Sequence, residues 1–112
     1  MANNWGISDA IERAVRSRDK SCVYCQRGFS AAQRGRRPTW EHIDNNEQHR
    51  GEENIALCCE SCNASKGAKK LLEWLGSPYA RKNNIRRDTV APVVQRYIQK
   101  TEGLEKAPPD GD

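Results

Sequence analysis

The chain has 112 residues, of which 36% are apolar and 30% are charged, so we expect one domain with a thin core of the kind that a metal ion or disulfides often reinforce. Nineteen Lys and Arg residues against fifteen Asp and Glu give a net charge of +4, which suits a polyanionic partner without requiring one. No apolar run approaches the roughly 18 residues of a membrane span and the first residues do not resemble a signal peptide, so no membrane contact and a cytoplasmic location are predicted.

The first predicted element is a helix over residues 8–18. Ser8 can cap it, and apolar side chains recur from Ile7 to Val15 at helical spacing. Residues 22–25 form a tight turn between two cysteines. The run from Ser30 to Gln33 has the spacing of a capping box and predicts one short helical turn, followed by a basic loop over residues 34–38.

The middle of the chain predicts two short strands and a helix. Residues 39–43 and 54–58 are rich in β-prone side chains, and the polar segment 44–53 between them reads as a loop. Residues 61–75 predict a helix that ends at Gly76.

The C-terminal part predicts two more helices. Ser77-Pro78 can open a short one, and residues 89–101 predict a final helix with Pro92 in its first turn. The polar, proline-containing segment from residue 104 to 112 is expected to be disordered. The predicted fold is therefore a small α+β domain over residues 1–103, with helices flanking two strands.

Two cysteine pairs dominate the chemistry that the sequence offers. Cys22-x-x-Cys25 and Cys59-x-x-Cys62 have the spacing that lets both sulfurs of a pair reach one ion, and together they predict a tetrahedral four-cysteine Zn²⁺ site. A redox-active thiol pair is the alternative, but no thioredoxin-like βαβ pattern surrounds either pair. Cys58 could replace Cys59 as ligand, although the spacing favours Cys59 and a small buried residue at position 58.

A site with four cysteine ligands is closed to water and is expected to be structural. Residues 26–58 separate the two pairs and are rich in other possible ligands. The zinc ion would therefore close the base of a polar segment that contains Trp40, Glu41, His42 and Asn54.

Three segments together resemble the HNH endonuclease motif. They are Glu41-His42-Ile43, Asn54-Ile-Ala-Leu57, and Cys59-Glu-Ser-Cys62-Asn63-Ala-Ser-Lys66, which follow the order of an acidic residue and His, then Asn, then Cys-x-x-Cys-Asn-x-x-Lys. The resemblance covers about residues 20–75, and the layout is also similar to that of phage endonuclease VII. Glu41 stands where the family usually has aspartate.

The resemblance implies a ββα-metal unit that hydrolyses DNA phosphodiester bonds. It makes His42 the general base, Glu41 and Asn63 the ligands of a catalytic Mg²⁺ or Mn²⁺, and Asn54 the residue that holds the loop and helps to fix His42. Lys66, on the Asn63 face of a helix, would meet a phosphate. Adjacent strand residues point to opposite faces, so Glu41 and His42 share a site only if the strand bends or ends there.

Each of these residues also has a structural interpretation. His42 could be a hydrogen-bonded strand residue, and Asn63 could satisfy backbone groups at a helix start. Asn54 could form an Asx turn, and Lys66 could lie on a solvated face with Lys69 and Lys70. His49, in the polar loop, is expected to be exposed.

Arginines at positions 34, 36 and 37 are the predicted DNA phosphate contacts. A monomer with one active site would nick DNA, whereas a homodimer could cut both strands. The main alternative function is a zinc-stapled DNA-binding module without catalysis, which the same cysteines and basic loop would serve. A zinc-stapled protein-interaction domain would need an exposed apolar surface, and the chain is too polar to suggest one.

Overall fold

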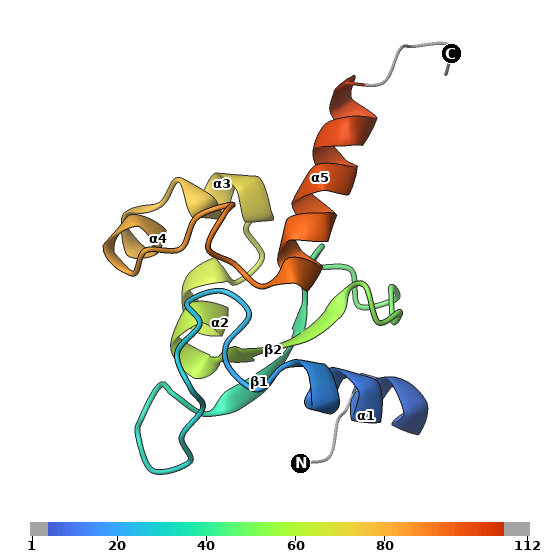
Figure 1. Ribbon diagram of the computed structural model, residues 1–112, viewed down its shortest axis with the longest axis vertical. Helices are drawn as coiled ribbons and strands as arrows, with labels where there is room; N and C mark the ends of the chain where they lie inside the picture. Colours follow the sequence, from blue (N-terminus) through green and yellow to red (C-terminus); the bar gives the residue numbers. More distant parts are fainter. Residues whose placement is uncertain (1–4, 107–112) are drawn as a thin grey trace.

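The computed structural model of the chain describes residues 5–106, with the side chains of residues 5–103. Its elements combine a two-stranded sheet with five helices, which agrees with the predicted α+β class (Figure 1). In chain order they are α1 (Asp9–Arg18), β1 (Pro38–His42), β2 (Ile55–Cys59), α2 (Glu60–Lys66), α3 (Leu71–Leu75), α4 (Pro78–Lys82) and α5 (Pro92–Lys106).

The two strands pair in the antiparallel sense across the whole of β1. Pro38 lies opposite Cys59, and His42 lies opposite Ile55. The strands fall within one residue of the predicted ranges, and residues 43–54 connect them as a loop, as the sequence indicated.

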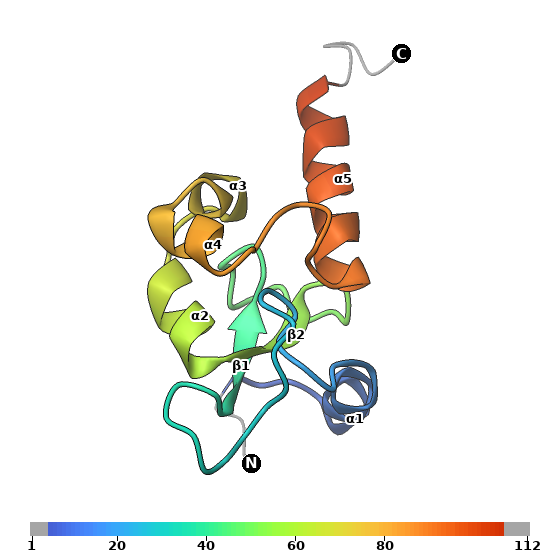
Figure 2. The same cartoon turned by 60° about the vertical axis from the view of Figure 1, so that its left-hand side comes forward.

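Alternating side chains divide the core between the two faces of this hairpin. Trp40, Ile55 and Leu57 pack with α1 in a small apolar cluster. Ala56 and Cys58 belong instead to the larger cluster formed with the cysteine turn and helices α3, α4 and α5. Figures 1 and 2 show α1 below the strands and these three helices above them.

Helix α1 begins where the sequence predicted. The Ser8 hydroxyl accepts a hydrogen bond from Ile11 N at 3.2 Å, which satisfies one of the free amides of the first turn. The second predicted cap forms without a helix: Ser30 Oγ accepts from Gln33 N at 3.2 Å, but only bends and a turn follow. Gly35, with φ +83°, redirects the chain there.

The single helix predicted over residues 61–75 is wrong, because two short helices occupy this segment. Helix α2 ends at Lys66, and Gly67 takes φ +51° and ψ −130°, which no continuing helix can accommodate. Asn45 Nδ2 donates to Ala68 O and Lys69 O, at 3.2 and 2.9 Å, and so takes carbonyls that a continuous helix would use itself. The predicted end at Gly76 is confirmed by the end of α3 at Leu75.

The two C-terminal helices form, with shifted boundaries for the last. Ser77 caps α4 by accepting from Ala80 N at 3.2 Å. Helix α5 begins at Pro92, where the missing amide is harmless, and continues to Lys106, past the expected range of 89–101. It therefore extends into the tail that was predicted to be disordered, of which residues 107–112 lie outside the described part. No helix among the described residues is long and apolar enough to cross a membrane.

Candidate functional site

Four cysteine sulfurs converge at one end of the hairpin, as the spacing predicted. Cys22 and Cys25 lie in the turn after α1, Cys59 ends β2 and Cys62 lies in α2. Their sulfurs all lie within 4.8 Å of one another, and Cys25 Sγ is 3.9 Å from Cys59 Sγ. A zinc tetrahedron with bonds of about 2.3 Å has edges of about 3.8 Å, so the cluster has the size and ligand chemistry of a structural zinc site.

Backbone contacts shape this cluster before any metal is considered. Gln26, with φ +65°, donates its amide to Cys22 O at 3.0 Å and so closes the first cysteine turn. Val23 N donates to Leu57 O at 3.2 Å, which fastens this turn to β2. Cys58 lies outside the cluster, with no solvent exposure, and its burial raises the pKa of its thiol. This placement confirms Cys59, and not Cys58, as the fourth member.

The four cysteine sulfurs also shift the pKa values of one another's thiols. Hydrogen bonds with the Cys22 sulfur lower the pKa of the Cys25 and Cys59 thiols and raise the pKa of the Cys62 thiol. A divalent cation that binds the four sulfurs would displace protons from them.

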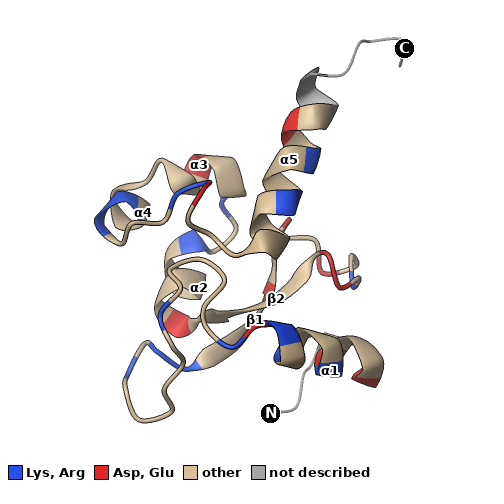
Figure 3. Cartoon of the chain, in the orientation of Figure 1, with Lys and Arg blue, Asp and Glu red and all other residues tan. Residues whose placement is uncertain are grey.

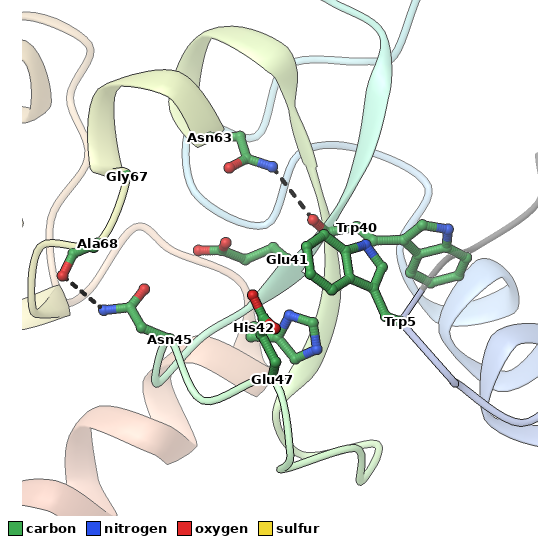
Figure 4. Close-up of a pocket in the computed structure, with 9 residues that line it drawn as sticks. All are labelled: Trp5, Trp40, Glu41, His42, Asn45, Glu47, Asn63, Gly67 and Ala68. Carbon is green, nitrogen blue, oxygen red and sulfur yellow. Dashed lines mark hydrogen bonds between the residues drawn. The ribbon is translucent and has the colours of Figure 1, made fainter.

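A pocket of about 220 Å³ lies beside β1 and is lined by three of the predicted site residues, Glu41, His42 and Asn63. Glu41 and His42 do point to opposite faces of the hairpin: Glu41 contacts Tyr24 on the face of the large cluster, and His42 contacts Trp5 on the α1 face. Both line one pocket because β1 has a free outer edge, around which the pocket extends (Figure 4).

Glu41 is buried and held on one oxygen. The Tyr24 hydroxyl donates to Glu41 Oε2 at 2.6 Å, and Lys66 Nζ lies 3.1 Å from the same oxygen. Lys66 has no solvent exposure and also donates to Asn45 Oδ1 at 2.7 Å. The alternative that Lys66 lies on a solvated face is wrong, because its ammonium lies inside the protein as the partner of Glu41. Its contact with a DNA phosphate stays a prediction.

His42 is 7% exposed, and its ring meets the Trp5 ring edge-to-face with centroids 5.2 Å apart. Burial lowers the pKa of His42, against the opposing effect of the Glu41, Glu47 and Asp44 carboxylates. Its Nε2 is buried without a hydrogen-bond partner among the described residues. A neutral imidazole with an unused nitrogen is therefore present at this pocket.

Asn63 lies in the middle of α2 and reaches across to β1. Its Nδ2 donates to Thr39 Oγ1 at 2.9 Å and to Trp40 O at 3.3 Å. These bonds fix the amide so that its oxygen lies on the side of Glu41 (Figure 4). Asn63 therefore does bond a backbone group, as its structural interpretation predicted, but that group is in strand β1 and not at a helix start. Its amide oxygen faces the pocket.

Asn54 closes the loop between the strands, as predicted. It is 1% exposed, accepts from Asp44 N at 2.9 Å, and donates to Asp44 Oδ1 and His49 O at 2.8 and 3.0 Å. It makes no described contact with the His42 ring. His49 is more engaged than expected, because its two ring nitrogens lie 2.8 Å from Asp44 Oδ2 and 2.7 Å from Glu53 Oε1. These contacts raise the pKa of His49.

The three arginines of the basic loop differ in exposure. The loop that leads into β1 carries basic segments (Figure 3). Within it Arg34 and Arg37 are exposed, and Arg37 lies 3.9 Å from Glu60. Arg36 is half-buried and donates twice to Gly28 O, at 2.9 and 3.3 Å. Two arginines are therefore free to meet a phosphate, and the third holds the loop in shape.

Sequence reasoning missed three residues that build the pocket. Tyr24 lies between Cys22 and Cys25, and this position within the predicted metal-binding turn could have indicated that its side chain helps to build the site. Asn45 has φ +64°, and nothing in the sequence indicated that its side chain would bind both Lys66 and the turn after α2. Trp5 precedes the first helix and is the only large apolar side chain that is exposed among the described residues.

Comparison of the chain with protein-family models, with curated proteins and with solved structures gives no match. Two features of the chain therefore bear on its function: the four-cysteine cluster and the pocket that gathers Glu41, His42 and Asn63.

Proposed function

We propose that this chain is a metal-dependent endonuclease that hydrolyses phosphodiester bonds in DNA, with β1, β2 and α2 as a ββα-metal unit of the HNH type. The observation that carries the proposal is the pocket itself. It gathers an unpartnered imidazole and a buried carboxylate from β1 and an oriented amide oxygen from α2. The four-cysteine cluster lies where β2, the partner strand of β1, meets α2. The order of strand, strand and helix also agrees with such a unit.

His42 suits the role of general base. Its lowered pKa keeps the ring neutral at pH 7, so that one nitrogen is able to accept a proton from water. A buried polar nitrogen without a partner is rare in proteins and often belongs to a functional site. The edge-to-face contact with Trp5 fixes the plane of the ring.

The pocket offers oxygen ligands of the kind that Mg²⁺ and Mn²⁺ prefer. Tyr24 and Lys66 occupy Oε2 of Glu41, which leaves Oε1 for the pocket, and Asn63 presents its amide oxygen there. These two residues would hold the ion, with water and substrate completing its shell. When bound, such an ion stabilises negative charge on the phosphate and on the leaving oxygen.

A plasmid nicking assay across a Mg²⁺ titration tests the proposal. We expect the parent to convert supercoiled DNA to the nicked form, since each chain carries one proposed catalytic site. General-base catalysis contributes about 10²–10⁴ in rate, so His42→Ala should lose at least about that much while it still binds DNA. Asn63→Ala and Glu41→Ala should shift the response to higher Mg²⁺, with zinc content unchanged in all three variants.

The controls decide whether an observed activity belongs to this pocket. Nicking by His42→Ala at the parent's rate would place the base elsewhere or reveal a contaminating nuclease. If the parent never nicks with Mg²⁺ or Mn²⁺, the chain is better explained as a zinc-stapled DNA-binding module, a function that the exposed Arg34 and Arg37 support independently.

DNA binding separates that second function from a protein-interaction role. Replacing Arg34 and Arg37 with Ala should weaken binding to every sequence and flatten its salt dependence, because fewer counterions are released. Arg36→Ala serves as the contrast, since its guanidinium binds the chain itself and its loss should act through loop stability. A loss confined to one DNA sequence would show base reading by the loop.

A further inference from the structure

Lys66 is the only buried cation among the described residues. Its side chain has no solvent exposure, and burial of an unpaired ammonium carries a large free-energy cost. The cost is offset by two oxygens, Glu41 Oε2 at 3.1 Å and Asn45 Oδ1 at 2.7 Å. Lys66 therefore lies behind the pocket wall, where it supports two of the lining residues, Glu41 and Asn45.

Asn45 keeps this ammonium from swinging out to solvent. Its backbone has φ +64°, and its Nδ2 donates to Ala68 O and Lys69 O on the turn that follows α2. The side-chain oxygen that receives Lys66 is thus fixed by two other bonds. The lysine is held between the end of β1 and the end of α2.

Lys66, behind the pocket wall, opposes the negative charge of Glu41 before any ion binds. Glu41 contributes one negative charge and Lys66 one positive charge 3.1 Å from its Oε2, and Asn63 is neutral. Glu47 also lines the pocket, but its side chain is exposed at the rim, where water and salt screen its charge. A divalent cation that enters this pocket alone therefore meets two good oxygen ligands and little net attraction.

From this balance we propose, on the basis of the proposed nuclease function, that Lys66 is the resident counter-ion of Glu41. It positions the carboxylate, and it makes tight binding of a divalent cation depend on a phosphodiester that brings its own negative charge. Metal and substrate phosphate then bind cooperatively, and each raises the affinity of the other by the same factor. Lys66 is a positioning residue, because it acts through Glu41.

Mn²⁺ binding to the zinc-loaded full chain, followed by the electron paramagnetic resonance signal of free Mn²⁺, tests this proposal without any turnover. Mn²⁺ prefers oxygen ligands and does not displace zinc from thiolates. We expect millimolar affinity for the parent without DNA. Lys66→Met keeps the length of the side chain but removes its charge, and it should bind Mn²⁺ at least about tenfold more tightly, since the repulsion is lost.

Lys69→Met is the matched control. Lys69 lies one turn away at an exposed position, where it donates to Ser65 O, so the same change of net charge should leave Mn²⁺ affinity as in the parent. Equal tightening by Lys69→Met, or none by a folded Lys66→Met, would overturn the counter-ion role.

Two further measurements keep the proposal open to refutation if Lys66→Met does not fold. Lys66→Gln retains a donor for Glu41 and should also tighten Mn²⁺ binding. Micromolar Mn²⁺ binding by the parent, without DNA or phosphate, would overturn the proposal whatever the variants do. A chain that never nicks DNA but shows the Lys66 effect would refute the nuclease function and leave the counter-ion role intact.

Discussion

Polar side chains on the two faces of strand β1 differ in their hydrogen bonding. On the face of the four-cysteine cluster, Glu41 receives a hydroxyl and an ammonium, and its oxygen Oε2 is fully engaged. On the α1 face, Trp40 Nε1 and His42 Nε2 are buried without a hydrogen-bond partner among the described residues. One strand thus carries a hydrogen-bonded polar network around Glu41 Oε2 on one side and two unpartnered nitrogens on the other.

The bonded groups on one face are fixed in position, whereas the unpartnered nitrogens on the other face remain able to bind or react. A satisfied buried network fixes its members, because every displacement breaks several bonds at once. An unsatisfied nitrogen retains its capacity to bind a proton, water or substrate. The pocket at the edge of β1 receives one group of each kind, which suits a site that must orient a phosphate and also remove a proton.

Loss of the cysteine-bound metal should have the largest effect, because it removes the support of the Glu41 face. Structural zinc contributes about 10 kcal/mol or more of apparent binding energy to folding. We therefore expect strong chelation, or Cys25→Ala, to unfold the chain, as followed by circular dichroism and by zinc release to an indicator dye.

Cys58→Ala is the matched control for this prediction, since Cys58 is buried beside the cluster but does not belong to it. It should retain one zinc ion per chain and a cooperative unfolding transition. A chelated chain that keeps the parent's spectrum would show that the hydrophobic core suffices without metal.

Tyr24→Phe should have a smaller effect, because it removes only the hydroxyl that donates to Glu41 Oε2. A hydrogen bond to a charged group contributes about 2 kcal/mol, so urea unfolding should show a loss of that order with zinc content unchanged. Tyr97→Phe is the control, since its hydroxyl has no hydrogen bond to a described residue. A double-mutant cycle with Glu41→Gln should show strong coupling for Tyr24, and additivity there would refute the contact.

The smallest expected effect concerns the two histidines. The pKa of His42 should lie below the ordinary value of 6.5, and that of His49 above it. Burial lowers the pKa of His42, and hydrogen bonds to Asp44 and Glu53 raise the pKa of His49. The stability linked to His42 is present above pH 6.5 and falls as acid charges the ring. That linked to His49 is present below pH 6.5 and is lost as pH rises through its raised pKa.

An NMR titration resolves both rings, because the chain has two histidines. Trp5→Ala should return the pKa of His42 part of the way toward 6.5, since it uncovers the ring, and Trp5→Phe should do so less. The pKa of His49 should stay unchanged in both variants. Identical titration of the two rings would contradict the contrast between them.

The sequence predicted the parts of this molecule that local chemistry decides. Cysteine spacing identified the four sulfurs, β-prone composition placed both strands, and Ser8 and Ser77 marked two helix starts. The helix starts, the strands and each Cys-x-x-Cys pair depend on residues a few positions apart, and their placement is confirmed. The roles of His42, Glu41 and Asn63 in catalysis stay predictions.

The errors arose where distant residues decide the outcome. Asn45, more than twenty positions earlier in the chain, interrupts the helix predicted over 61–75. Its side-chain amide donates to the Ala68 and Lys69 carbonyls, which a continuous helix would use itself. Lys66 reads as a surface lysine on the predicted helix, and only the approach of Glu41 and Asn45 explains its burial. Arg36 reads as one of three equivalent arginines until the fold brings Gly28 O within its reach.

Asn54 closes the interstrand loop and leaves a tip of exposed residues at its end. Asn54 ties Asp44 to His49, and the exposed residues at the tip, 46–48, bond only within the loop. Lengthening a closed loop costs little, about 0.6 kcal/mol for each doubling of its length. A dye or a short peptide inserted after Gln48 would thus report from the rim of the pocket without disturbing the strands that build it.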